Sequence, residues 1–191
     1  SNPPVALTVQ PASVTEGTGS TIELNITISA VQKNPQTFGI LLQGSDVVQE
    51  DFVNQPKNIE IGAGNTSGSV TVTINDDNLI EGTESVTASI NVLPEGIDLA
   101  PQSEATFQIL DNDFASIQLS GTETAMPEGN QPAQFSIKLD TGTLELRKDL
   151  VIDLSLDPGN VAIGTFGDSS SPLIPGQDFR IFPDQITIQA G

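Results

Sequence analysis

The chain of 191 residues contains no cysteine, histidine, tryptophan or tyrosine. The lack of cysteine excludes disulfides, zinc–thiolate sites and thiol nucleophiles, and the lack of histidine removes the usual general base near pH 7. Basic residues are also scarce, because 6 lysines and arginines stand against 25 acidic residues and give a formal net charge of −19. Such a polyanion is repelled by nucleic acids and by anionic lipids, and it concentrates cations.

Long apolar runs are missing too. None approaches the roughly 18 to 20 residues of a membrane span, so we expect neither membrane insertion nor nucleic-acid binding. The few lysines and the many Thr, Ser, Asn and Gln residues favour a secreted or surface protein of bacterial type. The composition therefore predicts an extracellular or cell-surface location.

What the sequence does contain is alternation of apolar and polar residues with period two. Side chains alternate across a strand, so each alternating segment gives one buried and one solvated face. Turn-rich segments separate the runs, and no segment has a sustained helical period. This pattern predicts an all-β fold, an immunoglobulin-like, seven-stranded antiparallel β-sandwich. The alternating positions are Val5/Leu7/Val9, Ile22/Leu24/Ile26/Ile28, Phe38/Ile40/Leu42, Ile59/Ile61, Val70/Val72/Ile74, Val86/Ala88/Ile90/Val92 and Ala105/Phe107/Ile109.

An internal repeat follows from three matches within the chain. Residues 50–64, EDFVNQPKNIEIGAG, align without a gap with residues 177–191, QDFRIFPDQITIQAG, and VTEG at 14–17 matches MPEG at 126–129. The segment Leu150/Ile152/Leu154/Leu156 likewise matches the strand around Phe38. We therefore predict two tandem copies, 1–113 and 114–191, the second of which stops after about four strands. Half a sandwich exposes an apolar face, so we expect further chain, or another chain, to complete it.

Acidic residues of the first copy concentrate in particular turns. Residues 1–113 hold 15 acidic residues and two lysines. The acidic turns follow the first, third, fifth and seventh predicted strands, and in an antiparallel sandwich such turns collect at one end. We therefore expect the following carboxylates to converge there: Glu16, Asp51, Asp76, Asp77, Glu81, Glu84, Asp111 and Asp113.

Converging carboxylates require a positive partner. Two like charges about 4 Å apart repel by about 1 kcal/mol in water and about 4 kcal/mol near a protein surface. Ca²⁺ suits the set, since it takes about 6 to 8 oxygen ligands, whereas Mg²⁺ demands a stricter octahedron and Zn²⁺ prefers nitrogen and sulfur. The alternative is that these acids are ordinary turn residues, which Asp and Asn favour through side-chain to backbone hydrogen bonds.

The segments VTEG, EDF, INDDNLIEGTES and ILDND resemble the Calx-beta repeat family. That family includes calcium-sensing domains of sodium/calcium exchangers and repeats of long bacterial surface proteins. The resemblance implies a calcium site with Asn112 in place of an acid, hence one charge fewer and a lower affinity or ion count. Only Glu128 and Asp178 of the set recur in the second copy, where no complete site is expected. The implied ligands are the side chains of Glu16, Asp51, Asp76, Asp77, Glu81 and Glu84, the backbone carbonyl of Leu79, and Asp111, Asn112 and Asp113.

These observations predict a calcium-binding structural or adhesive repeat of a larger cell-surface or secreted protein. Ca²⁺ would stiffen the loops and the junction between neighbouring repeats, and a surface glycan or protein would be a further partner. The alternatives are a cytosolic Ca²⁺ sensor as in the exchangers, a non-binding spacer, and a carbohydrate-binding sandwich. The last lacks the Trp and Tyr platforms that sugars usually require. An enzyme is not expected, because the carboxylates form one dense group without an aromatic cleft.

Overall fold

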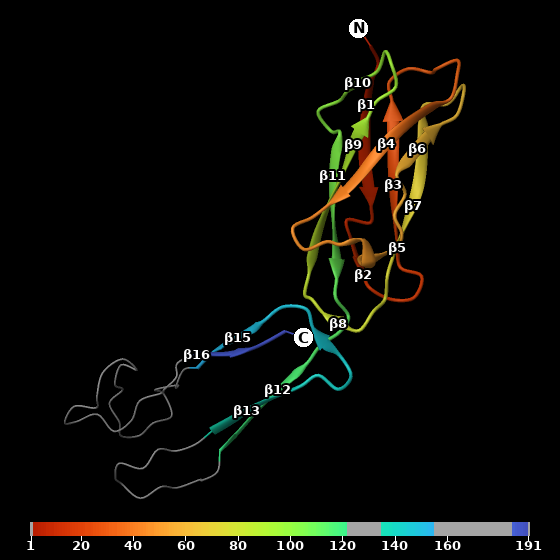
Figure 1. The fold of residues 1–191 in the computed structure, drawn as a ribbon. Coiled ribbons are helices and arrows are strands. Elements are labelled where there is room, and N and C mark those ends of the chain that lie inside the picture. The colour runs from red at the N-terminus through yellow and green to blue at the C-terminus, as the bar shows by residue number, and fades with distance from the viewer. Residues whose placement is uncertain (1, 122–134, 155–184, 191) are drawn as a thin grey trace, which may run out of the picture. The chain divides into compact units, whose positions relative to one another are not determined.

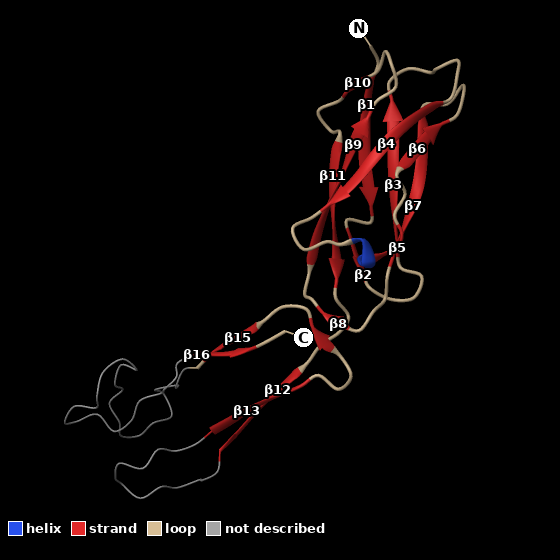
Figure 2. Cartoon of the chain, in the orientation of Figure 1, coloured by secondary structure: helices blue, strands red, loops and turns tan. Residues whose placement is uncertain are grey.

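The computed structural model describes residues 2–121, 135–154 and 185–190, and nearly all of its regular structure is β-strand (Figure 2). The exception is a single-turn 3₁₀ helix, η1 (Gln49–Asp51). Within those ranges no helix has the length and apolar character of a membrane-spanning segment. The predicted all-β class is thus confirmed.

Residues 4–110 form two five-stranded sheets that enclose one core (Figure 1). The first sheet has the order β10 (Asp98–Leu99), β1 (Pro4–Gln10), β3 (Thr21–Ile28), β7 (Ser67–Ile74) and β5 (Phe52–Asn54). The second has the order β2 (Ser13–Thr15), β11 (Glu104–Leu110), β9 (Glu84–Val92), β4 (Gln36–Gln43) and β6 (Asn58–Ile61). A two-residue strand, β8 (Leu79–Ile80), lies between β7 and β9 along the chain.

The core is built from the alternating apolar positions. Ile22, Leu24 and Ile26 of β3 are completely buried, and they face the likewise buried Phe38 and Phe107 of the second sheet. Burying each such side chain contributes about 1.5–3 kcal/mol relative to leaving it in water. The sandwich is therefore stabilised by the same residues whose period predicted its strands.

All seven predicted segments lie in strands, but the predicted count of seven is too low. The structure adds the short strands β2, β5, β8 and β10, none of which is long enough to show alternation. Two of them also pair parallel rather than antiparallel, namely β10 with β1 and β2 with β11. Pro11, which has no N–H to donate, separates β1 from β2, and there the chain passes from the first sheet to the second.

The chain divides into two compact units, residues 1–144 and 145–191. Beyond the sandwich, the first unit contains an antiparallel pair, β12 (Ser116–Gly121) with β13 (Phe135–Asp140). The second unit contains β14 (Glu145–Leu146) and the antiparallel pair β15 (Leu150–Asp153) with β16 (Gln185–Ile188).

The pairing in the second unit involves segments that the predicted repeat matches with β4 and β6. Ile186 lies opposite Ile152, as Ile59 lies opposite Phe38 in the sandwich. The remaining comparison between the copies involves residues 122–134 and 155–184, which lie outside the described ranges, as do Glu128 and Asp178. The two tandem copies and their boundary at residues 113 and 114 therefore stay a prediction.

Candidate metal centre

Parallel pairing places the first two acidic residues of the site side by side. Thr15 at the end of β2 pairs with Leu110 at the end of β11. The next residues along the two strands are Glu16 and Asp111, and the backbone N–H of Glu16 donates to the Leu110 carbonyl at 2.9 Å. Because both strands run the same way, both acids leave the sheet at the same end.

Two further pairings bring the remaining acidic segments to that end. Phe52 of β5 pairs with Ile74 of β7, and the N–H of Asn75 donates to the carbonyl of Asp51 at 2.9 Å. Asp51 is thereby held next to the start of the acidic loop that follows β7. Glu84, the first residue of β9, pairs with Ile109 of β11. Figure 1 shows β2, β5 and β8 together at one end of the sandwich, opposite the N-terminus.

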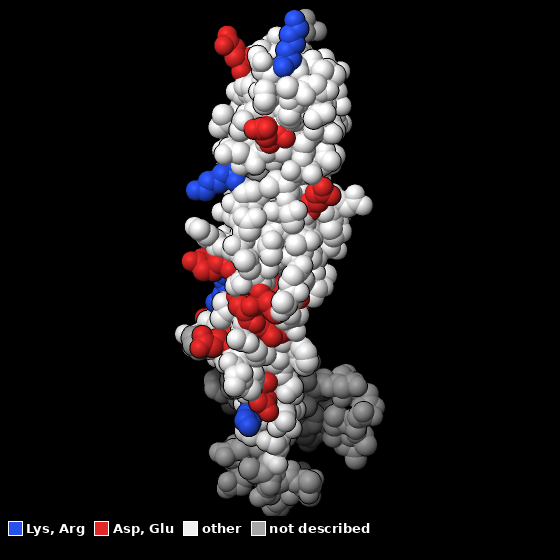
Figure 3. Space-filling view, turned by 90° about the vertical axis from the view of Figure 1, so that its right-hand side faces the viewer, with Lys and Arg blue, Asp and Glu red and all other residues white. Residues whose placement is uncertain are grey.

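Five carboxylates at this end form two overlapping groups. Carboxylate oxygens of Glu16, Asp77 and Glu81 all lie within 4.8 Å of one another, and so do those of Asp51, Glu81 and Glu84. Glu81 belongs to both groups, so a single side chain links them. Figure 3 shows Asp and Glu side chains gathered at the height of β8, whereas those nearer the N-terminal end stand apart.

Three of these acids are buried. Glu16 is 7% exposed, and Asp51 and Glu84 are each 3% exposed. The Glu16 atom Oε2 is buried without a hydrogen-bond partner, and so is Oδ2 of Asp113. A buried carboxylate oxygen without a partner is costly, since native structures satisfy nearly all such atoms. These two oxygens therefore point to a ligand that supplies positive charge.

The electrostatics of the site favour the protonated form of Glu16 in the absence of an ion. Burial raises the pKa of Glu16 from 4.5 to about 8, and the nearby charges of Asp77, Glu81, Asp111 and Glu84 add to the shift. The pKa of Asp113 is raised as well, first by loss of hydration and then by Asp111, Asp77 and Asp76. Both shifts express the same physical fact, that carboxylates are crowded together where water is limited.

Asp111 fixes the loop that carries Glu81. Its Oδ2 accepts the backbone N–H groups of Glu81 at 2.7 Å and Gly82 at 2.9 Å, and its Oδ1 accepts that of Asp113 at 2.7 Å. Gly82 has φ +81°, a conformation that glycine adopts without strain. Asp111 thus positions the residue that links the two carboxylate groups.

Asp76 is held by neutral donors instead. The side-chain nitrogen of Asn112 donates to Oδ1 of Asp76 at 3.0 Å, and the Thr18 hydroxyl donates to Oδ2 at 3.3 Å. The same Asn112 nitrogen also donates to the backbone carbonyl of Glu16 at 3.0 Å. Within the described residues, Asp76 is in neither of the two carboxylate groups.

The other predicted ligands lie in the same loops and make local hydrogen bonds. Oδ1 of Asp77 accepts the N–H of Leu79 at 2.8 Å, and Oδ2 of Asp51 accepts the N–H of Val48 at 2.6 Å. The predicted convergence at one end of the sandwich is therefore present in the structure. Binding of an ion by these residues, including the Leu79 carbonyl, stays a prediction.

Sequence reasoning missed the residues that brace the site. Thr18 and Gly82 hold Asp76 and Asp111, respectively, and neither carries a charge that would have drawn attention. The available signal was their position, because each lies within two residues of a predicted ligand, in turns rich in glycine. Turn residues of this kind commonly supply hydrogen bonds to neighbouring loops.

The donor set fits a hard divalent cation. The converging groups offer carboxylate oxygens, with backbone carbonyls nearby, and the chain has no histidine or cysteine to add nitrogen or sulfur. Oxygen ligands in flexible loops suit Ca²⁺, whereas Mg²⁺ requires a near-ideal octahedron. The arrangement is therefore chemically suited to calcium.

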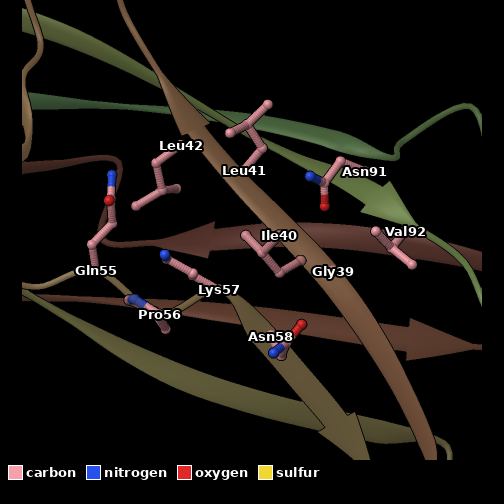
Figure 4. Close-up of a pocket in the computed structure, with 10 residues that line it drawn as sticks. All are labelled: Gly39, Ile40, Leu41, Leu42, Gln55, Pro56, Lys57, Asn58, Asn91 and Val92. Atoms are coloured by element: carbon pink, nitrogen blue, oxygen red, sulfur yellow. The ribbon is translucent and has the colours of Figure 1, made fainter.

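A groove on the second sheet has a different character (Figure 4). It is lined by residues 39–42 of β4, 55–58, and 91–92 of β9. Among the residues that the structure describes, Lys57 is the only ionisable one that lines it, and none of the described carboxylates does. A lone lysine beside amide and aliphatic side chains does not provide an acid and a base, so this groove has no catalytic pair.

These features define an all-β sandwich with an acidic loop cluster at one end. The model of the Calx-beta domain family matches residues 2–113, more than half of the chain. The chain belongs to the Calx-beta family, as its sequence motifs predict. No curated protein sequence matches it.

The solved structures that match the chain have low sequence identity to it. The apo form of the CBD1 domain of Calx is 21% identical, with 57% of this chain and 98% of that chain covered and a TM-score of 0.47. CBD12 from CALX1.2 is 15% identical, with 73% and 71% covered and a TM-score of 0.48. The calcium binding domain CBD12 of CALX1.1 is also 15% identical, with 77% and 78% covered and a TM-score of 0.46.

Proposed function

We propose that the chain is a calcium-binding structural repeat of a larger cell-surface or secreted protein. The observation that carries this proposal is the buried Glu16 carboxylate: its Oε2 has no hydrogen-bond partner, and one of its oxygens lies within 4.8 Å of carboxylate oxygens of Asp77 and Glu81. A divalent cation would supply the missing interaction and reduce the repulsion among the acids. Membership of the Calx-beta family supports the same conclusion.

Calcium would stiffen the end of the sandwich. Glu16 follows β2, Asp77 and Glu81 lie between β7 and β9, and Asp51 precedes β5. Ions held by the two carboxylate groups would restrict all three loops, because Glu81 belongs to both groups and each ligand fixes the position of its own backbone. Asp111 and Asp113 extend this effect to the point where the chain leaves β11, so calcium would also restrict the junction with the next repeat.

An adhesive or spacing role at the cell surface fits this use of calcium. The ion is abundant outside cells, and extracellular modules bind it with dissociation constants of about 10⁻⁴–10⁻³ M, whereas cytosolic sensors work at about 10⁻⁷–10⁻⁵ M. The strongly acidic composition also suits a soluble surface module. The function does not require catalysis, which agrees with the non-catalytic nature of the family.

Calorimetry of the metal-stripped chain tests the proposal. Titration with Ca²⁺ up to millimolar concentration should give binding heat, and the melting temperature should rise relative to chelator. At about ten times the dissociation constant, bound ligand adds about 1.4 kcal/mol to the free energy of unfolding. Mg²⁺ at the same concentration should stabilise less. The absence of heat together with an unchanged melting temperature would leave only a non-binding spacer.

The measured affinity decides where the module works. A dissociation constant near 10⁻⁴–10⁻³ M supports the extracellular structural role, and one near a micromolar supports an intracellular sensor instead. Small-angle scattering with and without Ca²⁺ then tests the junction. Calcium should narrow the distribution of chain dimensions if it restricts the segment that follows Asp113.

A further inference from the structure

The hairpin of β12 and β13 repeats the pairing of β1 with β3. In each pair of strands, two aliphatic cross-strand pairs lie two residues apart, and alternation places all four side chains on one face. The cross-strand pairs are Val5–Ile28 and Leu7–Ile26 in the sandwich, and Ile117–Leu139 and Leu119–Ile137 in the hairpin. The hairpin therefore has the same register and the same apolar face as the first two strands of the sandwich.

The burial of these two faces is opposite. Val5 and Leu7 are 0% and 1% exposed, whereas Ile117 and Leu119 are 50% and 66% exposed. In the sandwich, the sheet continues beyond β3 with β7, and the second sheet covers the apolar face. Among the described residues, β12 and β13 form a sheet of two strands only. A two-stranded hairpin is marginally stable in water, so this face and its free edge favour an added strand.

The free edge that corresponds to the β7 side of β3 belongs to β13. On that side of β3, the N–H of Ile28 donates to the carbonyl of Thr66 at 2.9 Å. Backbone groups of an antiparallel strand point alternately to its two neighbours, so Ile26 uses the same side as Ile28. Their counterparts in the hairpin are Ile137 and Leu139, whose N–H and C=O groups therefore face away from β12.

The strand that such an edge accepts has the chemistry of β7. This strand runs antiparallel to β3 and places Gly68 opposite Ile26 and Val70 opposite Leu24. Its other side carries serine and threonine, and it contains no charged residue. A second copy of the chain is a poor donor, because its β7 is already paired and two chains of formal charge −19 repel each other.

We infer that the outer edge of β13 is a strand-acceptor site, which binds an uncharged, extended partner strand of the β7 pattern in antiparallel orientation. The register of β3 with β7 places the partner residue equivalent to Gly68 opposite Ile137. The added strand extends the apolar face of the hairpin to three strands, the number at which a sheet gains stability of its own. Main-chain hydrogen bonds give the affinity and alternate side chains give the specificity. The site does not require calcium.

A synthetic peptide of residues 65–75 tests the site on the full chain in chelator. The labelled peptide should bind saturably, with one peptide per chain, in fluorescence anisotropy. At about ten times the dissociation constant about nine-tenths of the chains are occupied, so hydrogen exchange of the Ile137 and Leu139 amides should slow by about tenfold. The amide of Lys138, which points towards β12, should change less. Nuclear magnetic resonance resolves these three amides.

Matched peptides separate strand pairing from general apolar adhesion. An N-methyl group on Val70 removes an N–H that faces the acceptor strand and should abolish binding, whereas one on Thr71 alters an N–H that points away and should be tolerated. Val70→Asp in the peptide puts a charge on the apolar face and should weaken binding by about tenfold or more. Thr71→Asp adds the same charge on the solvent face and should weaken it less.

Several results would overturn the strand-acceptor site. These are unchanged exchange at Ile137 and Leu139, equal binding of the two N-methyl peptides, and equal binding of the two aspartate peptides. Concentration-dependent protection without peptide, together with a dimer in sedimentation, would assign the edge to a second copy and reject the partner strand. Because every measurement is made in chelator, failure here leaves the calcium-binding proposal intact, and failure to bind calcium leaves the acceptor site intact.

Discussion

The carboxylate of Asp111 accepts a hydrogen bond from the backbone N–H of Glu81 at 2.7 Å, which joins residues 30 positions apart in the chain. Through this contact the end of β11 determines where the loop between β8 and β9 lies. Glu81 is the carboxylate shared by the two candidate ion-binding groups, so its backbone position affects both. The geometry of the candidate metal site therefore depends on the hydrogen bond between Asp111 and the backbone of Glu81.

Replacing Asp111 with alanine should destabilise the metal-free protein. The change leaves the N–H groups of Glu81, Gly82 and Asp113 without their acceptor, and a hydrogen bond to a charged group contributes about 1.5–3 kcal/mol. Urea unfolding in chelator measures the loss. Asp98→Ala is the control, because Asp98 accepts one exposed side-chain hydrogen bond from Asn2 and should change stability by about 0.5 kcal/mol or less. Equal losses in the two variants would contradict the role of Asp111.

Replacing Glu81 with glutamine should weaken calcium binding more than loss of a peripheral acid would. Glu81 contributes an oxygen to both groups, so a neutral amide there lowers the charge of each. We expect the dissociation constant to rise by about tenfold or more, equivalent to about 1.4 kcal/mol. Glu104→Gln makes the same chemical change at the exposed start of β11 and should leave the constant unchanged. A similar effect of both variants would indicate a diffuse electrostatic attraction rather than a site.

The stability of the metal-free protein should fall as the pH rises from 4.5 to about 8. Burial and the neighbouring acids raise the pKa of Glu16 to about 8 in the folded state, against 4.5 ordinarily. Between these values the folded protein holds a proton that the unfolded chain has released, so the free energy of unfolding decreases with pH. Unfolding in urea over a pH series measures the slope.

Glu16→Gln and calcium provide the checks on this pH dependence. The glutamine variant does not titrate, so its slope through the same window should be smaller, and an unchanged slope would assign the effect to other groups. Ca²⁺ requires the ionised carboxylate and should displace the proton. Calcium affinity should therefore increase with pH up to about pH 8, and the binding heat should depend on the buffer's ionisation enthalpy below it.

Replacing Gly39 with alanine should destabilise the sandwich without weakening calcium binding. A Cβ at this position would lie 2.6 Å from Cβ of Val92 and 2.7 Å from Oδ1 of Asn91, and the register of β4 against β9 shifts here (Figure 4). Overpacking of this kind costs about 1–3 kcal/mol. Gly62→Ala meets only the flexible Asn65 amide at 3.2 Å and should cost less. Thermal unfolding compares them, and equal effects would rule out a specific clash at Gly39.

The sequence by itself determined the long strands and their buried faces. Phe38, Phe107 and Ile22 are completely buried, as alternation requires, because period two assigns each side chain to a face whatever the strand pairs with. It also indicated which acidic residues would lie together at one end of the sandwich, because carboxylates recur in the turns after alternate strands. Local pattern is sufficient for both conclusions.

Only the tertiary structure decided how those acids meet. Glu16 lies beside Asp111 because β2 pairs parallel with β11, and a three-residue strand leaves no periodic trace in the sequence. The orientation of Asn112 was equally hidden, because an amide offers a donor and an acceptor, and the two oxygens of Asp76 and Glu16 select the donor. Pairing register and side-chain direction arise from contacts between distant segments, whereas alternation arises within a segment.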